Sequence, residues 1–326
     1  MKQIISKRRG AAAVIGGFFK DRTARALLLA AILAAIMGSL RPDKSEGMSG
    51  STYWARKMQW KQKAGAVLTG DSRVLMAVAP EIMEQYLDYE KILNYAFGAN
   101  WYCAEYMDAT EKLLVPGARK KAIIMGFSPH TLTWRTKGMG HFVEMSRRPQ
   151  LNRYLETHAG WFFDLLEPMS LRDAFHGLFP SMAPTQTVKD YRESGWIAVH
   201  KSPGDEDHEV KRYRGIYRER QVSSRTIAGA MKYVSRWSRM GIKVYGFVPP
   251  TCEGMVELER TASGFNKEHF VAEFEKAGGV WLEVNPTGYY SFDGSHLQNE
   301  GAIAFSHDLA KMIQKQENGG KVARSD

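Results

Sequence analysis

The chain has 326 residues, with 45 Lys and Arg against 35 Asp and Glu, and a formal net charge of +10. Hydrophobic residues make up 44% and charged residues 25%, which is ordinary for a globular protein and excludes a mainly disordered chain or a polytopic membrane protein. Two cysteines are too few for a small disulfide-stabilised scaffold. A positive charge of this size suits nucleic acid, an anionic membrane or an acidic polymer as partner, so the position of the charges matters.

The first 41 residues have the pattern of a targeting segment. Residues 1–25 hold seven basic residues and one acid, and the fifteen residues 26–40 hold no charge. Basic residues before an apolar run keep that end in the cytoplasm, so the rest of the chain is expected in the periplasm or outside the cell. No clear A-x-A cleavage site follows. We therefore expect 1–41 to be an uncleaved single-pass anchor in a bacterial inner membrane, with a cleaved signal or a buried core helix as alternatives.

The remaining chain shows an alternation of short apolar runs and amphipathic helices. Residues 42–60 begin with a polar, turn-rich stretch and are expected to be a linker. Five candidate strands follow within a domain at 61–314, at 64–69, 92–96, 121–125, 242–248 and 280–284. This alternation predicts an α/β fold with a parallel sheet of about five strands, in the order 2-1-3-4-5, and helices on both faces.

Two further segments do not follow that alternation. Residues 132–225 are too long for a simple crossover between the third and fourth strands, and we expect an insertion over the carboxyl edge of the sheet. Residues 315–326 are expected to be a polar tail.

Two motifs carry candidate chemistry. Gly70-Asp71-Ser72 directly follows the first candidate strand, and Asp293 and His296 lie three residues apart before the last helix. A histidine next to an aspartate can take a proton from serine as general base while the aspartate holds its tautomer. Each motif alone is common, as a plain turn or a helix-capping turn. Because a parallel sheet brings both to its carboxyl edge, together they predict one site.

These two motifs resemble those of the SGNH/GDSL hydrolase superfamily, over about residues 62–314 without the insertion. The resemblance implies a three-layer, flavodoxin-like α/β/α sandwich and hydrolysis or transfer of an acyl ester. It also implies that Ser72 is the nucleophile, His296 the base and Asp293 its orienting partner. No cofactor is expected, and the nine histidines show no spacing that suggests a metal site.

The resemblance also implies an oxyanion hole. In that superfamily it is formed by the N–H of the serine, a glycine N–H after the second strand and an asparagine after the third. Ser72 and Gly98 match the first two groups, but the third block reads GFSPH and lacks the asparagine. Ser128 or Asn100 is the candidate replacement, and helix capping is the alternative role of Asn100.

Two residues beside these motifs are candidates for substrate binding. Arg73 follows the serine, and His130 lies in the third block. For His130, a surface-loop histidine is the alternative.

The missing asparagine, the anchor and the long insertion are similar to one membrane-anchored branch of the superfamily. This branch includes polysaccharide O-acetyltransferases and the D-alanyl transfer protein of teichoic acid, which act beside a multi-pass membrane acyltransferase. The resemblance implies addition or removal of an acyl group, most simply acetyl, on an extracytoplasmic polysaccharide. The alternative is a non-catalytic glycan-binding or scaffolding subunit of a polysaccharide export complex.

Most of the positive charge lies in two segments. The N-terminal segment supplies +6 and residues 211–239 supply +8 of the total +10, so the remainder carries −4. An exported chain does not meet nucleic acid, so no nucleic-acid partner is expected. The second segment is interpreted either as a surface for an acidic glycan or lipid phosphate, or as a solvated helix face.

Overall fold

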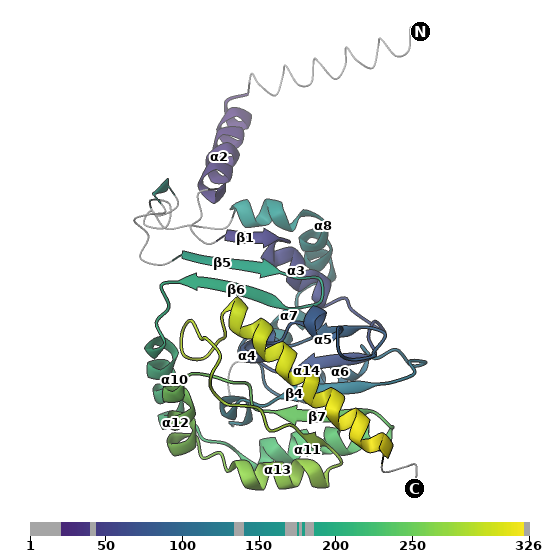
Figure 1. The fold of residues 1–326 in the computed structure, drawn as a ribbon. Helices are drawn as coiled ribbons and strands as arrows, with labels where there is room; N and C mark the ends of the chain where they lie inside the picture. Colours follow the sequence, from purple (N-terminus) through teal and green to yellow (C-terminus); the bar gives the residue numbers. More distant parts are fainter. Residues whose placement is uncertain are drawn as a thin grey trace.

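The computed structural model describes residues 21–39, 44–133, 140–166, 175, 178, 179 and 186–322. Its centre is a five-stranded parallel sheet with the strand order β3-β2-β4-β7-β8 (Figure 1). The strands are β2 (Ala66–Thr69), β3 (Ile92–Asn94), β4 (Ala122–Gly126), β7 (Lys243–Phe247) and β8 (Val280–Trp281). The predicted α/β class, the five parallel strands and their order are confirmed.

Helices cover both faces of this sheet, because alternate residues of each buried strand point to opposite sides. Leu68 and Ile124 face one apolar cluster, and Val67 and Ile123 face another. The first face is covered by α4 (Ser72–Ala77), α5 (Pro80–Met83) and α14 (Asn299–Val322). The second is covered by α6 (Ala104–Glu111), α11 (Ser224–Arg239) and α13 (Lys267–Lys276).

A second, smaller sheet combines part of the insertion with part of the expected linker. β1 (Lys44–Gly47) pairs in parallel with β5 (Gln186–Tyr191), which pairs antiparallel with β6 (Ile197–Ser202). Beside it, α3 (Gly50–Lys57) packs on α8 (Gln150–Leu166), which follows α7 (His141–Ser146). Residues 44–57 of the expected linker therefore belong to a folded unit. The partners of β1 in β5 and of α3 in α8 lie about a hundred residues or more away in sequence, so a local pattern does not reveal them.

Two described parts of the insertion reach the carboxyl edge of the main sheet: residues 205–219 contact the turn that carries Asp293 and His296, and the N–H of His141, at the start of α7, donates to the carbonyl of Gly98 at 3.3 Å. There α10 (Asp207–Glu219) packs against α12 (Glu253–Ala262), and the 3₁₀ turn η1 (Pro129–Leu132) follows β4. The backbone N–H groups of Asp205 and Glu209 donate to the carbonyls of Phe292 and Asp293, at 2.8 and 3.0 Å. The expected position at this edge thus applies to α10 and the start of α7, whereas β5 and β6 build the smaller sheet.

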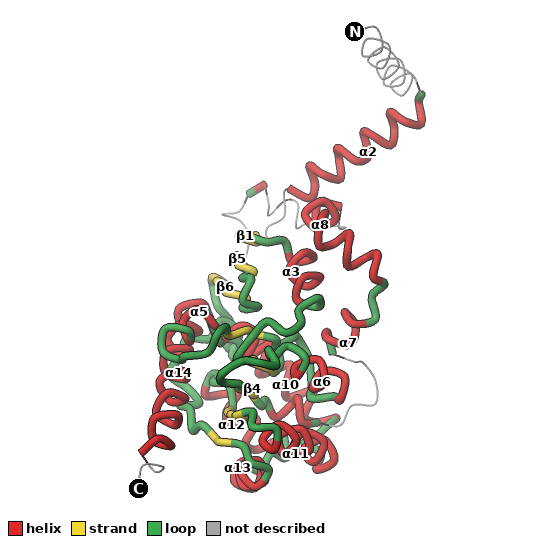
Figure 2. Tube along the Cα trace, turned by 90° about the vertical axis from the view of Figure 1, so that its right-hand side faces the viewer, coloured by secondary structure: helices red, strands yellow, loops and turns green. Residues whose placement is uncertain are grey.

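The apolar run near the N-terminus forms α2 (Arg22–Ser39), which projects from the end of the molecule that carries the small sheet (Figures 1 and 2). The side chains of Leu27, Leu29 and Leu33 are 66%, 58% and 54% exposed. Within the described ranges, no helix has the length and apolar character needed to cross a membrane. Residues 1–20 of the expected cytoplasmic flank lie outside the described residues.

Gly126, the last residue of β4, provides a test of how closely the sheet and α4 are packed. A Cβ at this position would lie 2.2 Å from Cγ2 of Val74 and 3.1 Å from the ring of Phe247. We expect Gly126→Ala to lower the free energy of unfolding by about 1–3 kcal/mol, as overpacking does, in urea denaturation. Gly215→Ala is the control, because Gly215 lies within α10 with open space around it. It is expected to raise stability by up to about 1 kcal/mol. Equal effects of the two variants would contradict this packing.

Candidate active site

The turn after β2 presents Ser72 at the start of α4. Asp71 is the N-cap residue of this helix, and its Oδ1 accepts the N–H of Arg73 at 3.0 Å. Such a cap satisfies a backbone donor that the helix itself cannot. Ser72 is partly exposed, whereas Asp71 and Arg73 are buried. Ser72 is therefore the one residue of this short turn that keeps some exposed surface, between two buried neighbours.

The other end of α4 is held by Asn94, the last residue of β3. Its Nδ2 donates to the carbonyls of Val74 and Val78, both at 2.9 Å. Its Oδ1 accepts the N–H of Ala96 at 3.1 Å. One buried side chain thus couples the serine helix to the loop that carries Gly98.

The structure brings together the three residues expected to form a triad. His296 Nε2 lies 2.8 Å from Ser72 Oγ, and His296 Nδ1 lies 2.8 Å from Asp293 Oδ2. An ionised carboxylate only accepts, so Nδ1 carries the proton and Nε2 is left to accept from the serine hydroxyl. The arrangement has the geometry of a nucleophile, its general base and the group that orients the base.

Asp293 is held in its ionised form. Burial acts to raise the pKa of this carboxyl, but the hydrogen bond and charge of His296, with two backbone N–H groups, bring the pKa below its usual value. Those N–H groups belong to Ser295 and His296 and lie 2.9 and 2.8 Å from Oδ1. A carboxyl with a lowered pKa stabilises the fold above its ordinary pKa of about 3.9, and the contribution disappears as the pH falls through the lowered value.

Arg73 lies beneath the site and has no exposed surface. Its guanidinium forms a two-bond ion pair with Glu259, at 2.8 and 3.2 Å, and its Nε donates to Ser295 Oγ at 2.9 Å. Tyr217 also donates to Glu259, at 2.9 Å. The structure therefore corrects the expected contact of Arg73 with a substrate: this side chain joins the serine turn to the Asp293–His296 turn.

His130 is also buried, at 3% exposure. Its Nε2 lies 3.1 Å from Asp71 Oδ2, and its ring packs edge-on against Tyr213. Neither the expected substrate contact nor the alternative of a surface loop describes this position. His130 instead packs behind the cap of the serine helix.

The oxyanion-hole candidates occupy the two loops that flank the serine turn. Gly98 and Asn100 follow β3, and Ser128 follows β4, and these two strands are the neighbours of β2. Asn100 and Ser128 are 2% and 0% exposed. Among the described residues, neither Nδ2 of Asn100 nor Oγ of Ser128 has a hydrogen-bond partner. Two buried donors at this edge are thus available.

Sequence analysis missed Glu259 and Tyr217. Both lie on amphipathic helices where a glutamate or tyrosine is unremarkable, and only the packing of α10 on α12 brings them to Arg73. No local pattern sets these two residues apart, and Arg73 itself was expected to contact a substrate. For metals, the described part of the chain contains no group of three or more His, Cys, Asp or Glu side chains able to hold an ion.

Comparison of the chain with protein-family models, with curated proteins and with solved structures found no match.

The buried ion pair under the site is testable through stability. Glu259→Gln removes the charge that compensates Arg73, and breaking such a pair costs about 3–5 kcal/mol of unfolding free energy. The matched control is Glu257→Gln on the same helix, since Glu257 forms an exposed ion pair with Arg260. Exposed pairs contribute little, so this control is expected to unfold as the unmodified protein does. Comparable unfolding free energies for both variants in urea denaturation would refute the role assigned to Glu259.

Proposed function

We propose that the protein is a serine acyltransferase or esterase of the SGNH type that acts on an extracytoplasmic polysaccharide. The observation that carries the proposal is His296, whose two ring nitrogens lie 2.8 Å from Ser72 Oγ and from Asp293 Oδ2. The Gly-Asp-Ser and Asp-x-x-His motifs on a five-stranded parallel sheet support it further. The acyl group is proposed to be acetyl.

The chemistry follows from the three side chains. Ser72 Oγ attacks the acyl carbonyl while His296 Nε2 takes its proton, and Asp293 stabilises the imidazolium. His296 then protonates the leaving group, and an acyl-serine remains. A sugar hydroxyl or water next gives its proton to His296 and attacks the acyl-serine. The bond between the acyl carbon and Ser72 Oγ breaks, His296 returns the proton to Oγ, and the product is an acylated glycan or a free acid. Exclusion of water from the acyl-serine decides between transfer and hydrolysis.

Developing negative charge on the carbonyl oxygen needs donors that are already in place. The N–H of Ser72 and of Gly98 are proposed as two of them, with Asn100 or Ser128 as the third. The unpaired, buried amide and hydroxyl support this assignment, because an unsatisfied buried donor is costly unless it serves a ligand.

The proposed location is the outer face of a bacterial inner membrane, with a cytoplasmic N-terminus and a multi-pass acyltransferase as the source of the acyl group. The exposed leucines of α2 and the basic residues before it support attachment through the N-terminal segment. The second candidate is a non-catalytic glycan-binding or scaffolding subunit, which the lack of the third-block asparagine favours.

Labelling with a fluorescent fluorophosphonate separates the two candidates. We expect the full-length protein to be labelled, Ser72→Ala to remain unlabelled, and the control Ser224→Ala, at an exposed serine that begins α11, to be labelled fully. The adduct forms only on a serine activated by its base, so in-gel fluorescence with mass spectrometry of the labelled peptide reads out Ser72 directly. An unlabelled, folded wild-type protein would favour the non-catalytic candidate.

The third oxyanion donor is tested by Asn100→Ala and Ser128→Ala, with p-nitrophenyl acetate as substrate. The variant that removes the donor is expected to lower kcat by about 10²–10³. Its unfolding free energy should change little, because the lost polar atom has no protein partner within the described residues. Unchanged kcat in both variants would exclude both side chains from the oxyanion hole.

A further inference from the structure

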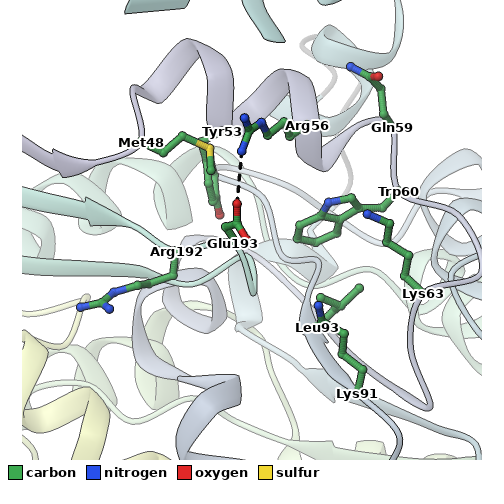
Figure 3. A pocket seen from close by; sticks show the side chains of 10 residues that line it. All are labelled: Met48, Tyr53, Arg56, Gln59, Trp60, Lys63, Lys91, Leu93, Arg192 and Glu193. Atoms are coloured by element: carbon green, nitrogen blue, oxygen red, sulfur yellow. Dashed lines mark hydrogen bonds and ion pairs between the residues drawn. The ribbon is translucent and has the colours of Figure 1, made fainter. Parts of the chain in front are cut away.

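A cavity of about 390 Å³, the flank cavity, lies where α3, the edge strand β3 and the turn between β5 and β6 meet (Figure 3). Its volume is within the range of about 300–1,000 Å³ that is typical of small-molecule sites. Its lining includes Lys63 and Lys91, which precede β2 and β3, and no residue of the proposed triad. The cavity is therefore a site in its own right.

The cavity is strongly cationic. Arg56, Lys63, Lys91 and Arg192 line it, against a single acid, Glu193. Glu193 is paired with Arg56 at 3.2 Å, and Arg192 forms an ion pair outside the cavity with Asp190. Within the described part of the chain, neither Lys63 nor Lys91 has a carboxylate partner, and both are exposed. Two ammonium groups are thus available to an anionic ligand.

An aromatic ring lies next to these cations. Figure 3 shows Trp60 beside Lys63, with the ion pair of Arg56 and Glu193 across the cavity and Leu93 below. The indole position depends on Gly195, because a Cβ there would lie 2.8 Å from Cη2 of Trp60. A flat aromatic surface packs against the apolar C–H face of a sugar ring, and ammonium groups form strong charge-assisted bonds with carboxylates. A phosphate alone would use the cations but leave the indole uncovered.

We propose that this cavity binds a carboxylate-bearing sugar unit of a polysaccharide. The sugar ring packs on Trp60, and its carboxylate lies between Lys63 and Lys91. This site would bind the polymer and would take no part in the acyl chemistry. The proposal therefore goes beyond that chemistry and does not depend on it.

The position of the cavity relates it to the candidate active site. It lies along β3, and the loop with Gly98 begins where this strand ends, so Lys91 is roughly 10 Å along the strand from Asn94. Tyr53, which lines the cavity, accepts a hydrogen bond from Lys57 at 2.9 Å, and Lys57 also donates to the carbonyl of Ala96 at 2.9 Å. A polymer held here thus lies along the strand whose carboxyl end leads into the loop that flanks Ser72.

Calorimetric titration of the full-length protein with an oligogalacturonate tests the proposal, and maltohexaose serves as the neutral probe. We expect binding of the acidic oligosaccharide only. The Lys63→Glu/Lys91→Glu variant should weaken it by at least about tenfold, as loss of bonds to charged groups does. Trp60→Leu should also weaken binding, and Glu193→Gln should strengthen it by removing the only acid in the lining.

The matched control is Lys232→Glu/Arg239→Glu, which reverses the same number of charges on α11 and should bind as the wild type does. The proposal would be overturned if the protein bound maltohexaose as tightly as oligogalacturonate. It would also be overturned if oligogalacturonate binding were lost only in this α11 variant. Binding to phosphatidylglycerol vesicles that depends on Lys63 and Lys91, without binding of the oligogalacturonate, would assign the cavity to a membrane surface instead. If the protein binds oligogalacturonate but its Ser72 does not react with the fluorophosphonate, only the proposed acyl chemistry is contradicted. If Ser72 reacts but oligogalacturonate does not bind, only the proposed carbohydrate site is contradicted.

Discussion

The buried ion pair between Arg73 and Glu259 is the interaction on which the candidate site depends. Arg73 follows Ser72 directly, and it also bonds Ser295, the neighbour of His296, so one guanidinium spans two turns more than 200 residues apart in sequence. A buried pair stabilises a fold only where geometry is good and the remaining polar atoms are bonded. Here Tyr217 supplies a further bond to Glu259. The 2.8 Å contact between His296 and Ser72 is therefore supported from below by this buried pair.

A second buried cation, Lys57, connects the small sheet to the same edge of the main sheet. It has no carboxylate among its bonded partners, which are the hydroxyl of Tyr53 and the carbonyls of Ala96 and Gly195. Burial lowers the pKa of its ammonium well below the usual range. Three oxygens from α3, the β3 loop and the insertion converge on one nitrogen. The insertion therefore belongs to the framework of the candidate site, because it helps to hold the loop that carries Gly98.

Sequence analysis could predict the features that repeat or that follow a strand. Parallel strands are continuous apolar runs, and Ser72, Asp293 and His296 lie where such strands or their loops meet, so both the sheet and the triad were accessible. Positions that depend on contacts between segments far apart in sequence could not be predicted. Arg73 has the sequence signature of an exposed arginine, and only the packing of α12 supplies its acid. The strand at 44–47 is polar and four residues long, and β5, the strand it pairs with, begins at residue 186.

The charge of a surface is likewise hard to predict from sequence, because it depends on which acids the fold places beside the basic residues. Residues 211–239 sum to +8, yet Arg236 pairs with Asp108 and Glu111 on α6, and Arg212 pairs with Glu209. A sum over a sequence segment ignores acids that the fold brings in from other elements, so it overstates the charge that a partner would meet. The lysines of the flank cavity come from two separate segments, and one of these, residues 56–63, holds four basic residues and no acid. Trp60 and Lys63 lie in that short stretch, and the fold adds Lys91 from another segment, so the charge sum over residues 211–239 is a poor guide to where cations lie beside an aromatic ring.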